Sequence, residues 1–410
     1  MSIYDALIRK GSTGGRNIAE AIENLPGWSG SSARNIEEAI DGVDMGGMES
    51  VFDAMAVGAN PLSQVYGKSA NIVVSSAFFS LRQLQEVSFP NVSAIGIDAF
   101  ARCYNLTTAS FPNANVIGNS AFMFCSSLTS VSFPNASVIG DYAFSKCSSL
   151  TSVSFPSASV IGVYAFTSCT SLTSVSFPSA SVIGNAAFMS CTGLTSVLFP
   201  NASVIGDWAF AYCSNLTTAS FPNASVIGSS AFTSCTGLTS VSFPNANVIG
   251  GSAFARCSNL TTASFPNVSD IGVDAFAYCS NLTSVSFPNA NVIGNAAFTS
   301  CSNLTTALFP NASVIGGSAF ARCSNLTTVS LANIQSIGSN AFRYCNNLLS
   351  LYLTGGSMSS VPALYSYDAF LSTPILGEYG SVYVPASLYS AFLVANNWMI
   401  ISSHIVSVAE

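Results

Sequence analysis

A strict internal period dominates the sequence. Its twelve cysteines lie 22 residues apart without exception, from Cys103 to Cys345. A fixed period of this length indicates a solenoid, in which each repeat forms one coil and contacts only its neighbours. The even spacing matches neither a zinc signature nor a close cysteine pair, so it favours a structural role for the thiols. We therefore expect every one of these cysteines to be reduced and buried as a small apolar residue.

Other residues keep the same phase and define the coil. The unit that starts at Leu150 reads LTSVSFPSASVIGVYAFTSCTS. Alternation predicts a strand with Val153 and Phe155 on its buried side and serines on the other, and Pro156 ends that strand. Gly162 is expected to permit a tight turn. The spacing of the alanine, phenylalanine and cysteine that follow predicts one helical or 3₁₀ turn.

This pattern of residues resembles a known repeat. The string C-x-x-L-x-x-[VA]-x-F-P…I-G-x-x-A-F-x-x-C is similar to the BspA-like (Treponema-type) leucine-rich repeat of bacterial and protist surface proteins, over roughly residues 62–353. The resemblance implies a leucine-rich-repeat solenoid. The segment from Gly380 to Trp398 also resembles the closing segment of many such proteins, including ones encoded near phage and prophage tail genes.

The predicted fold class is an α/β repeat solenoid of about thirteen 22-residue coils, with a parallel sheet on one face and short helical turns on the other. It should occupy residues 61–353, of which 61–83 form a degenerate capping coil. Residues 1–60 hold two similar amphipathic segments, Arg16–Ile22 and Arg34–Ile40, between Gly/Ser-rich stretches. We interpret them as an attachment or assembly segment, with a partly disordered tail as the alternative.

The last part of the chain departs from the period. Ala369-Phe370 follows the preceding Ala-Phe pair by 28 residues instead of 22. Residues 354–410 are therefore predicted to form a C-terminal cap, with a hairpin-like strand over 381–385 and a short helix over 387–396.

Charge and composition exclude several function classes. The chain has only 11 Lys and Arg and 18 Asp and Glu among 410 residues, and its net charge of −7 argues against nucleic acid. No apolar run reaches the ~18 residues of a spanning helix, and the first residues lack the apolar core of a secretory signal. The single histidine, His404, leaves little room for histidine-dependent catalysis. We expect a non-enzymatic protein without metal, cofactor or membrane insertion.

Variation within the unit concentrates on two surface positions. They are the second residue after the repeated glycine and the residue four further on, which share one face of a helical turn. The latter is rich in Tyr, Arg and Ser, as recognition surfaces are. Drift at exposed positions is the alternative. The hypothetical ligand-binding residues are Arg102, Phe124, Tyr142, Lys146, Tyr164, Trp208, Tyr212, Arg256, Tyr278, Arg322 and Tyr344.

The outward strand positions offer a second candidate surface. They are almost all Ser or Thr, which suits carbohydrate contact or an ice-binding array, but also a plain solvated sheet. Leu198 and Leu308 interrupt the hydroxyl rows and would weaken an ice lattice.

The resulting hypothesis is a binding or adhesion protein displayed on a phage or phage-like particle. Its array would contact a host-surface carbohydrate or protein, and residues 1–60 would attach to other virion proteins. Two alternatives stay open: a structural spacer or decoration fibre of a virion, and a bacterial or protist cell-surface adhesin. Homo-oligomerisation is also left open.

Overall fold

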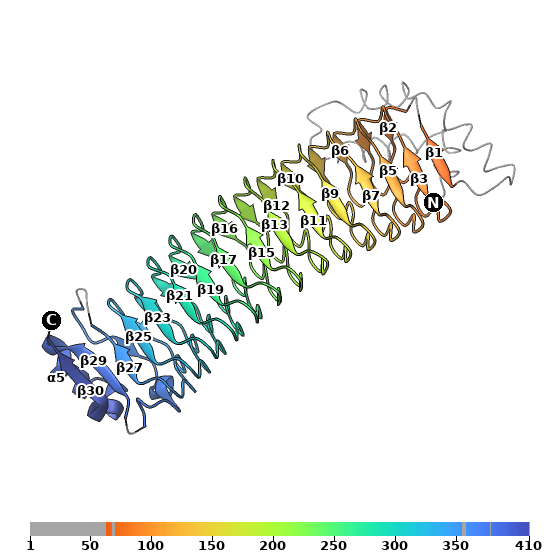
Figure 1. Ribbon diagram of the computed structural model, residues 1–410. Coiled ribbons are helices and arrows are strands. Elements are labelled where there is room, and N and C mark those ends of the chain that lie inside the picture. Colours follow the sequence, from red (N-terminus) through yellow and green to blue (C-terminus); the bar gives the residue numbers. More distant parts are fainter. Residues whose placement is uncertain (1–62, 68–69, 355–357, 378, 410) are drawn as a thin grey trace, which may run out of the picture. The chain divides into compact units, whose positions relative to one another are not determined.

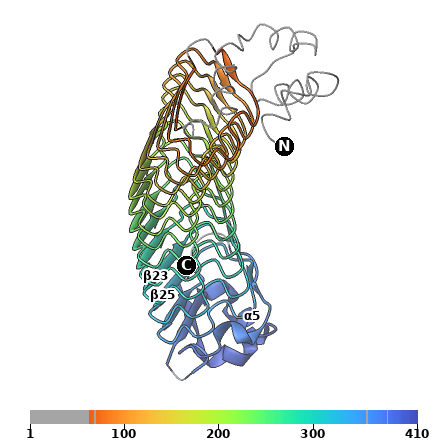
Figure 2. The same ribbon diagram turned by 90° about the vertical axis from the view of Figure 1, so that its right-hand side faces the viewer.

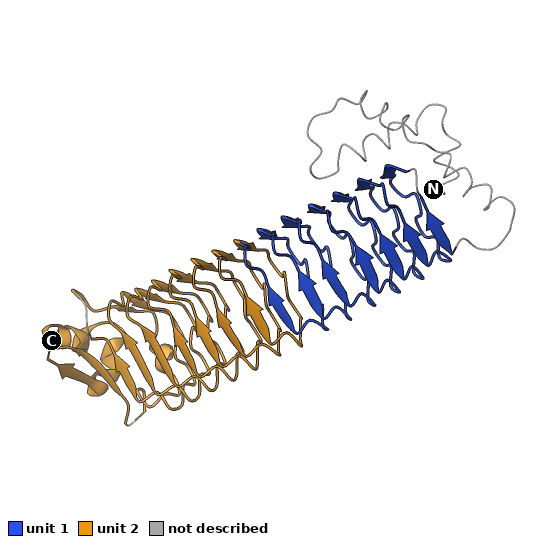
Figure 3. Cartoon of the chain, turned by 45° about the horizontal axis from the view of Figure 1, so that its top comes forward, with its two compact units in different colours: residues 1–202 blue, residues 203–410 orange. Residues whose placement is uncertain are grey.

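The computed structural model describes residues 63–67, 70–354, 358–377 and 379–409. The predicted attachment segment, residues 1–60, lies outside these residues. The chain divides into two compact units, residues 1–202 and 203–410, which are built from the same kind of coil (Figure 3).

Each coil of unit 1 contributes two short strands, where the sequence predicted one. The longer strands are β1 (Gln64–Tyr66), β3 (Glu86–Ser88), β5 (Thr108–Ser110), β7 (Ser130–Ser132), β9 (Ser152–Ser154), β11 (Ser174–Ser176) and β13 (Ser196–Leu198). The two-residue strands are β2 (Ile72–Val73), β4 (Ala94–Ile95), β6 (Val116–Ile117), β8 (Val138–Ile139), β10 (Val160–Ile161) and β12 (Val182–Ile183) (Figure 1).

Unit 2 repeats the arrangement and ends in the cap. Its longer strands are β15 (Thr218–Ser220), β17 (Ser240–Ser242), β19 (Thr262–Ser264), β21 (Ser284–Ser286), β23 (Thr306–Phe309), β25 (Thr328–Leu331), β27 (Ser350–Tyr352), β29 (Ser381–Pro385) and β30 (Ile405–Val408). Its second series is β14 (Val204–Ile205), β16 (Val226–Ile227), β18 (Val248–Ile249), β20 (Asp270–Ile271), β22 (Val292–Ile293), β24 (Val314–Ile315), β26 (Ser336–Ile337) and β28 (Ala363–Leu364).

Neighbouring coils pair in parallel with a register of one repeat. Val153 of β9 pairs with Val175 of β11, and Val160 of β10 pairs with Val182 of β12. In the same way β23 and β25 lie side by side in unit 2 (Figure 2). The predicted parallel solenoid is therefore confirmed. The second strand escaped prediction because two apolar residues are too short a run to show alternation.

The segment expected to be helical is a run of tight turns. Among residues 70–354 the structure contains no helix. Instead, the N–H groups of Ala99, Ala101 and Cys103 donate to the carbonyl three residues earlier. Asp98 and Arg102, with φ of 55° and 63°, lie in the left-handed region, so each interrupts a right-handed turn before a helix can continue.

Two phenylalanine ladders and the cysteines fill the core. The rings of Phe122 and Phe144 stack with centroids 5.2 Å apart, and Phe111 meets Phe122 edge to face at 5.9 Å. All twelve cysteines are buried thiols, as the sequence predicted. Burial raises the pKa of the Cys103 and Cys257 thiols to about 12, since a thiolate would be desolvated there.

The repeated glycine has a different role from the one predicted. Gly162 is required by a close approach between coils rather than by turn conformation. A Cβ at this position would lie 2.5 Å from the carbonyl carbon of Gly140 in the preceding coil. The glycines therefore allow the backbones of successive coils to touch.

The end of unit 2 forms the short elements η1 (Tyr367–Phe370), η2 (Ala386–Leu388), α5 (Tyr389–Val394) and η3 (Trp398–His404). The ring of Phe370 stacks on Phe342 at 5.8 Å, so the Ala-Phe position survives the longer spacing. The strand predicted over 381–385 is confirmed as β29, but the hairpin is wrong, because β29 pairs in parallel with β27 and β30. No helix in the described part of the chain has the length and apolar character needed to span a bilayer.

Candidate functional site

The two variable positions share an unusual backbone conformation. In all twelve coils that carry the repeated cysteine, both positions have positive φ, although none of these residues is glycine. In unit 2, for example, Tyr278 has φ of 62° and Arg322 of 63°. A side chain in this region costs roughly 1–2 kcal/mol per residue. Strain of this kind is a reason to look for function at these positions.

Hydrogen bonds between coils hold this conformation. The Tyr278 N–H donates to the Thr299 carbonyl oxygen at 2.8 Å, and the Arg322 N–H donates to the Arg343 carbonyl oxygen at 2.7 Å. Each variable residue is thereby fixed to the next coil. The helical face assumed in the sequence prediction does not exist, and these two interlocked turns replace it.

In unit 1 the structure brings the five expected site residues into two clusters. The first is a row in which Arg102 and Lys146 lie 5.9 and 4.7 Å from the ring centre of Phe124. The second is the stacked pair Tyr142 and Tyr164, with centroids 4.8 Å apart and an interplanar angle of 9°. Cation–π contacts and offset stacking stabilise such rows.

Unit 2 holds the other six residues in three pairs. Trp208 and Tyr212 lie in one coil with ring centroids 6.3 Å apart. Arg256 lies 4.9 Å from the ring centre of Tyr278. Arg322 lies 5.6 Å from that of Tyr344. These pairs and the two clusters of unit 1 are called the aromatic clusters below. Most of their members are exposed, with Trp208 at 41% and Tyr278 at 49%.

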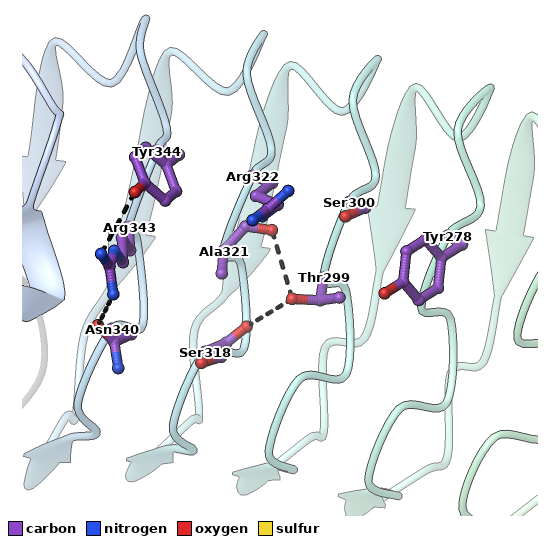
Figure 4. Close-up of a pocket in the computed structure, with 9 residues that line it drawn as sticks. All are labelled: Tyr278, Thr299, Ser300, Ser318, Ala321, Arg322, Asn340, Arg343 and Tyr344. Atoms are coloured by element: carbon purple, nitrogen blue, oxygen red, sulfur yellow. Dashed lines mark hydrogen bonds between the residues drawn. The ribbon is translucent and has the colours of Figure 1, made fainter.

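A hollow lies between the last two pairs of unit 2. It has a volume of about 470 Å³ and is lined by Tyr278, Thr299, Ser300, Ser318, Ala321, Arg322, Asn340, Arg343 and Tyr344. Figure 4 shows Tyr278 at one end and Arg322 and Tyr344 toward the other, with the small side chain of Ser300 between them. Small residues in the intervening coil therefore leave space between larger ones.

Sequence reasoning identified Tyr278, Arg322 and Tyr344 but missed the other residues that line the hollow. Arg343 carried a usable signal, because the residue after Ala-Phe is Ala, Met, Ser or Thr in the other eleven coils. Its Nη1 donates to Asn340 Oδ1 at 3.3 Å and its Nη2 to the Tyr344 hydroxyl at 3.2 Å. Its Nε is buried and has no acceptor.

The Ser/Thr face of the sheet spends many of its hydroxyls internally. The Thr261 hydroxyl donates to the Thr239 carbonyl oxygen at 2.9 Å, and the Thr283 hydroxyl donates to that of Thr261 at 3.1 Å. Leu308 is 57% exposed within this face. The aromatic clusters are therefore the stronger candidate surface.

Groups suited to catalysis are not assembled in the described residues. No set of three His, Cys, Asp or Glu side chains there could hold a metal ion. Nδ1 of His404 lies 2.9 Å from the Gly380 carbonyl oxygen in the cap, where it contacts backbone rather than an acid or a nucleophile.

Comparison with solved structures supports the leucine-rich-repeat fold. A leucine-rich-repeat protein from Bacteroides ovatus is 27% identical with a TM-score of 0.70, over 85% of this chain and 92% of that one. A leucine rich cell surface protein from Faecalibacterium prausnitzii is 24% identical with a TM-score of 0.42, over 72% and 84%. A Treponema pallidum leucine-rich-repeat protein is 29% identical with a TM-score of 0.32, over 44% and 79%.

Comparison of sequences identifies the family. No curated protein matches the chain. The model of the BspA type leucine rich repeat region, which describes six copies of the repeat, matches residues 63–169, 159–283 and 247–367. These matches indicate no catalytic family, and they cover most of the chain. The chain thus belongs to the BspA-type leucine-rich-repeat family.

Proposed function

We propose that this chain is a non-enzymatic binding or adhesion protein that acts at a cell surface through its aromatic clusters. One observation carries the proposal: all eleven residues singled out by variation contact another member of the set. Drift at exposed positions would not collect rings and cations side by side. Tyr, Trp and Arg are also the side chains that most often dominate binding energy at protein interfaces.

The surrounding surface favours contact rather than long-range attraction. The chain carries few charges for its length, so it cannot steer a ligand strongly over distance. Close stacking and hydrogen bonding must therefore supply affinity, which suits a host-surface carbohydrate or a neutral protein surface.

A double substitution in unit 2 tests the proposal. Trp208→Ser with Tyr212→Ser removes one exposed aromatic cluster, and attachment of the purified chain to host cells should fall at least tenfold. The matched control is Tyr365→Ser, since Tyr365 is 68% exposed and lies outside the clusters. If further Ser substitutions at Tyr278 and Tyr344 also leave attachment unchanged, the proposal fails and a spacer or decoration role is favoured.

Display on a phage particle is a second candidate. The resemblance of Gly380–Trp398 to endings encoded near tail genes favours it. In that case residues 1–60 would attach the solenoid to other virion proteins and residues 354–410 would cap it. Immunogold labelling with antibody to residues 1–60, on intact cells and on purified particles, separates the two locations.

A further inference from the structure

We propose that the hollow around Arg322 and Arg343 binds a carboxylate-bearing sugar, of the uronic or nonulosonic acid class, within a surface glycan. The inference rests on the proposed binding function and names the ligand class for one of the aromatic clusters. It is carried by the charge, the hydrogen-bonding groups and the shape of the hollow.

Uncompensated positive charge is the first part of the argument. The guanidinium of Arg343 lies 4.9 Å from the ring centre of Tyr344, and that of Arg322 lies 5.6 Å from the same centre. The hollow has no acidic lining residue. Two cations beside one ring repel each other, and an anion between or above them relieves that repulsion.

The hydrogen-bonding state of Arg343 is the second part. Asn340 and the Tyr344 hydroxyl hold two of its nitrogens, but its buried Nε–H has no acceptor. A buried polar group without a partner is unfavourable. A ligand carboxylate can accept from this guanidinium after a small rotation, and guanidinium and carboxylate groups match in a two-bond geometry.

The remaining lining suits a sugar ring. Tyr278 and Tyr344 lie three coils apart, about 14 Å at ~4.8 Å per coil. The volume of about 470 Å³ is that of a small-molecule site. Tyrosine rings offer apolar faces for the C–H groups of a pyranose, and Ser300, Ser318 and Asn340 offer groups for its hydroxyls.

One bond fixes the floor of the hollow. The Thr299 hydroxyl donates to the Ser318 carbonyl oxygen at 3.1 Å and is therefore occupied within the protein. Figure 4 shows this bond beneath the small side chains. The floor is thus set before a ligand arrives, which lowers the ordering cost of binding.

Direct titration of the full chain tests the ligand class. Glucuronic acid and N-acetylneuraminic acid represent the two kinds of acidic sugar, glucose is the neutral match, and glucose 6-sulfate is the sulfated match. We expect at least one carboxylate sugar to bind at least tenfold more tightly than glucose and glucose 6-sulfate. Equal binding of glucose, tighter binding of the sulfate, or no binding of either acid overturns the proposal.

Substitutions assign the binding to this hollow. Arg322→Gln and Arg343→Gln should each weaken acidic-sugar binding at least tenfold, while Arg343→Lys restores only part of it because a point charge lacks the guanidinium fork. Arg102→Gln is the control, since Arg102 occupies the equivalent left-handed position in unit 1. Unfolding curves of each variant show whether it is folded, and a loss equal to that of Arg102→Gln contradicts the assignment.

The two proposals fail separately. If no acidic sugar binds but the Trp208 and Tyr212 substitutions still abolish cell attachment, the ligand class is wrong and the binding function stands. If attachment is independent of every aromatic cluster, the binding function itself is wrong.

Discussion

The thiol of Cys125 donates a hydrogen bond to the carbonyl oxygen of Phe100 in the preceding coil, over 3.1 Å. The same oxygen accepts the N–H of Cys103 at 3.2 Å. Each cysteine therefore ties one coil to the coil before it, and the carbonyl uses both of its lone pairs. This bond recurs along the ladder, for example from Cys147 to Phe122 at 3.1 Å.

The thiol ladder should be chemically inert in the folded protein. Only the thiolate is a good nucleophile, and burial raises the pKa of Cys103 and Cys257 to about 12. At pH 8, iodoacetamide should label none of the repeat cysteines in the native chain and all twelve in denaturant, as mass spectrometry can count. Rapid native labelling at the central coils would contradict the buried ladder.

Alkaline pH should destabilise the fold through the same thiols. Below the ordinary thiol pKa of 9.0 they are neutral in both states, so stability does not depend on them. Above it, the unfolded chain loses protons that the folded chain retains. Stability therefore falls by about 1.4 kcal/mol per pH unit for each such thiol, toward pH 12 for Cys257.

Urea unfolding between pH 8 and 11 measures this loss. Cys257→Val removes one raised thiol and should make the fall in unfolding free energy shallower by one proton. A free energy of unfolding that stays constant from pH 9 to 11, with the wild-type chain and the variant alike, would refute the account.

Adjacent glycines give a sharp test of coil contact. A Cβ at Gly316 would lie 2.6 Å from the backbone nitrogen of Asn295, whereas one at Gly317 would meet nothing nearer than 3.4 Å. Gly316→Ala should cost about 3 kcal/mol or more, because backbone atoms must shift. Gly317→Ala should change stability by less than about 1 kcal/mol. Equal urea midpoints for the two variants would show that the coils are not in contact there.

The sequence predicted the coil better than it predicted the turn. The period and the alternation around Val153 led directly to the parallel solenoid and to the strand Ser152–Ser154. The left-handed conformation of Tyr164 was not predictable, because tyrosine does not favour positive φ. That conformation is fixed by a distant partner, the Asn185 carbonyl oxygen, which accepts the Tyr164 N–H at 2.8 Å.

The hollow was predictable only in part, for a related reason. Tyr278, Arg322 and Tyr344 stand out because each departs from the copied unit at a position already known to vary. The space between them depends on Ser300, a common residue at that position, lying in the coil between two large neighbours. A concave site in a solenoid is a property of several successive coils, and no single repeat contains it.

Glycine substitutions at two neighbouring alanines should separate backbone strain from core packing. Ala296 has φ of 53°, while Ala297 is fully buried and is not among the residues with positive φ. Ala296→Gly relieves roughly 1–2 kcal/mol of strain and costs roughly 0.5–1 kcal/mol of chain entropy, so stability should stay level or rise by up to about 1 kcal/mol. Ala297→Gly pays the same entropy and also loses a buried methyl group, so it should destabilise by about 1–2 kcal/mol. Urea unfolding of both variants at pH 7 measures the difference. If Ala296→Gly is as destabilising as Ala297→Gly, the left-handed turns are not the strained positions that this structure shows.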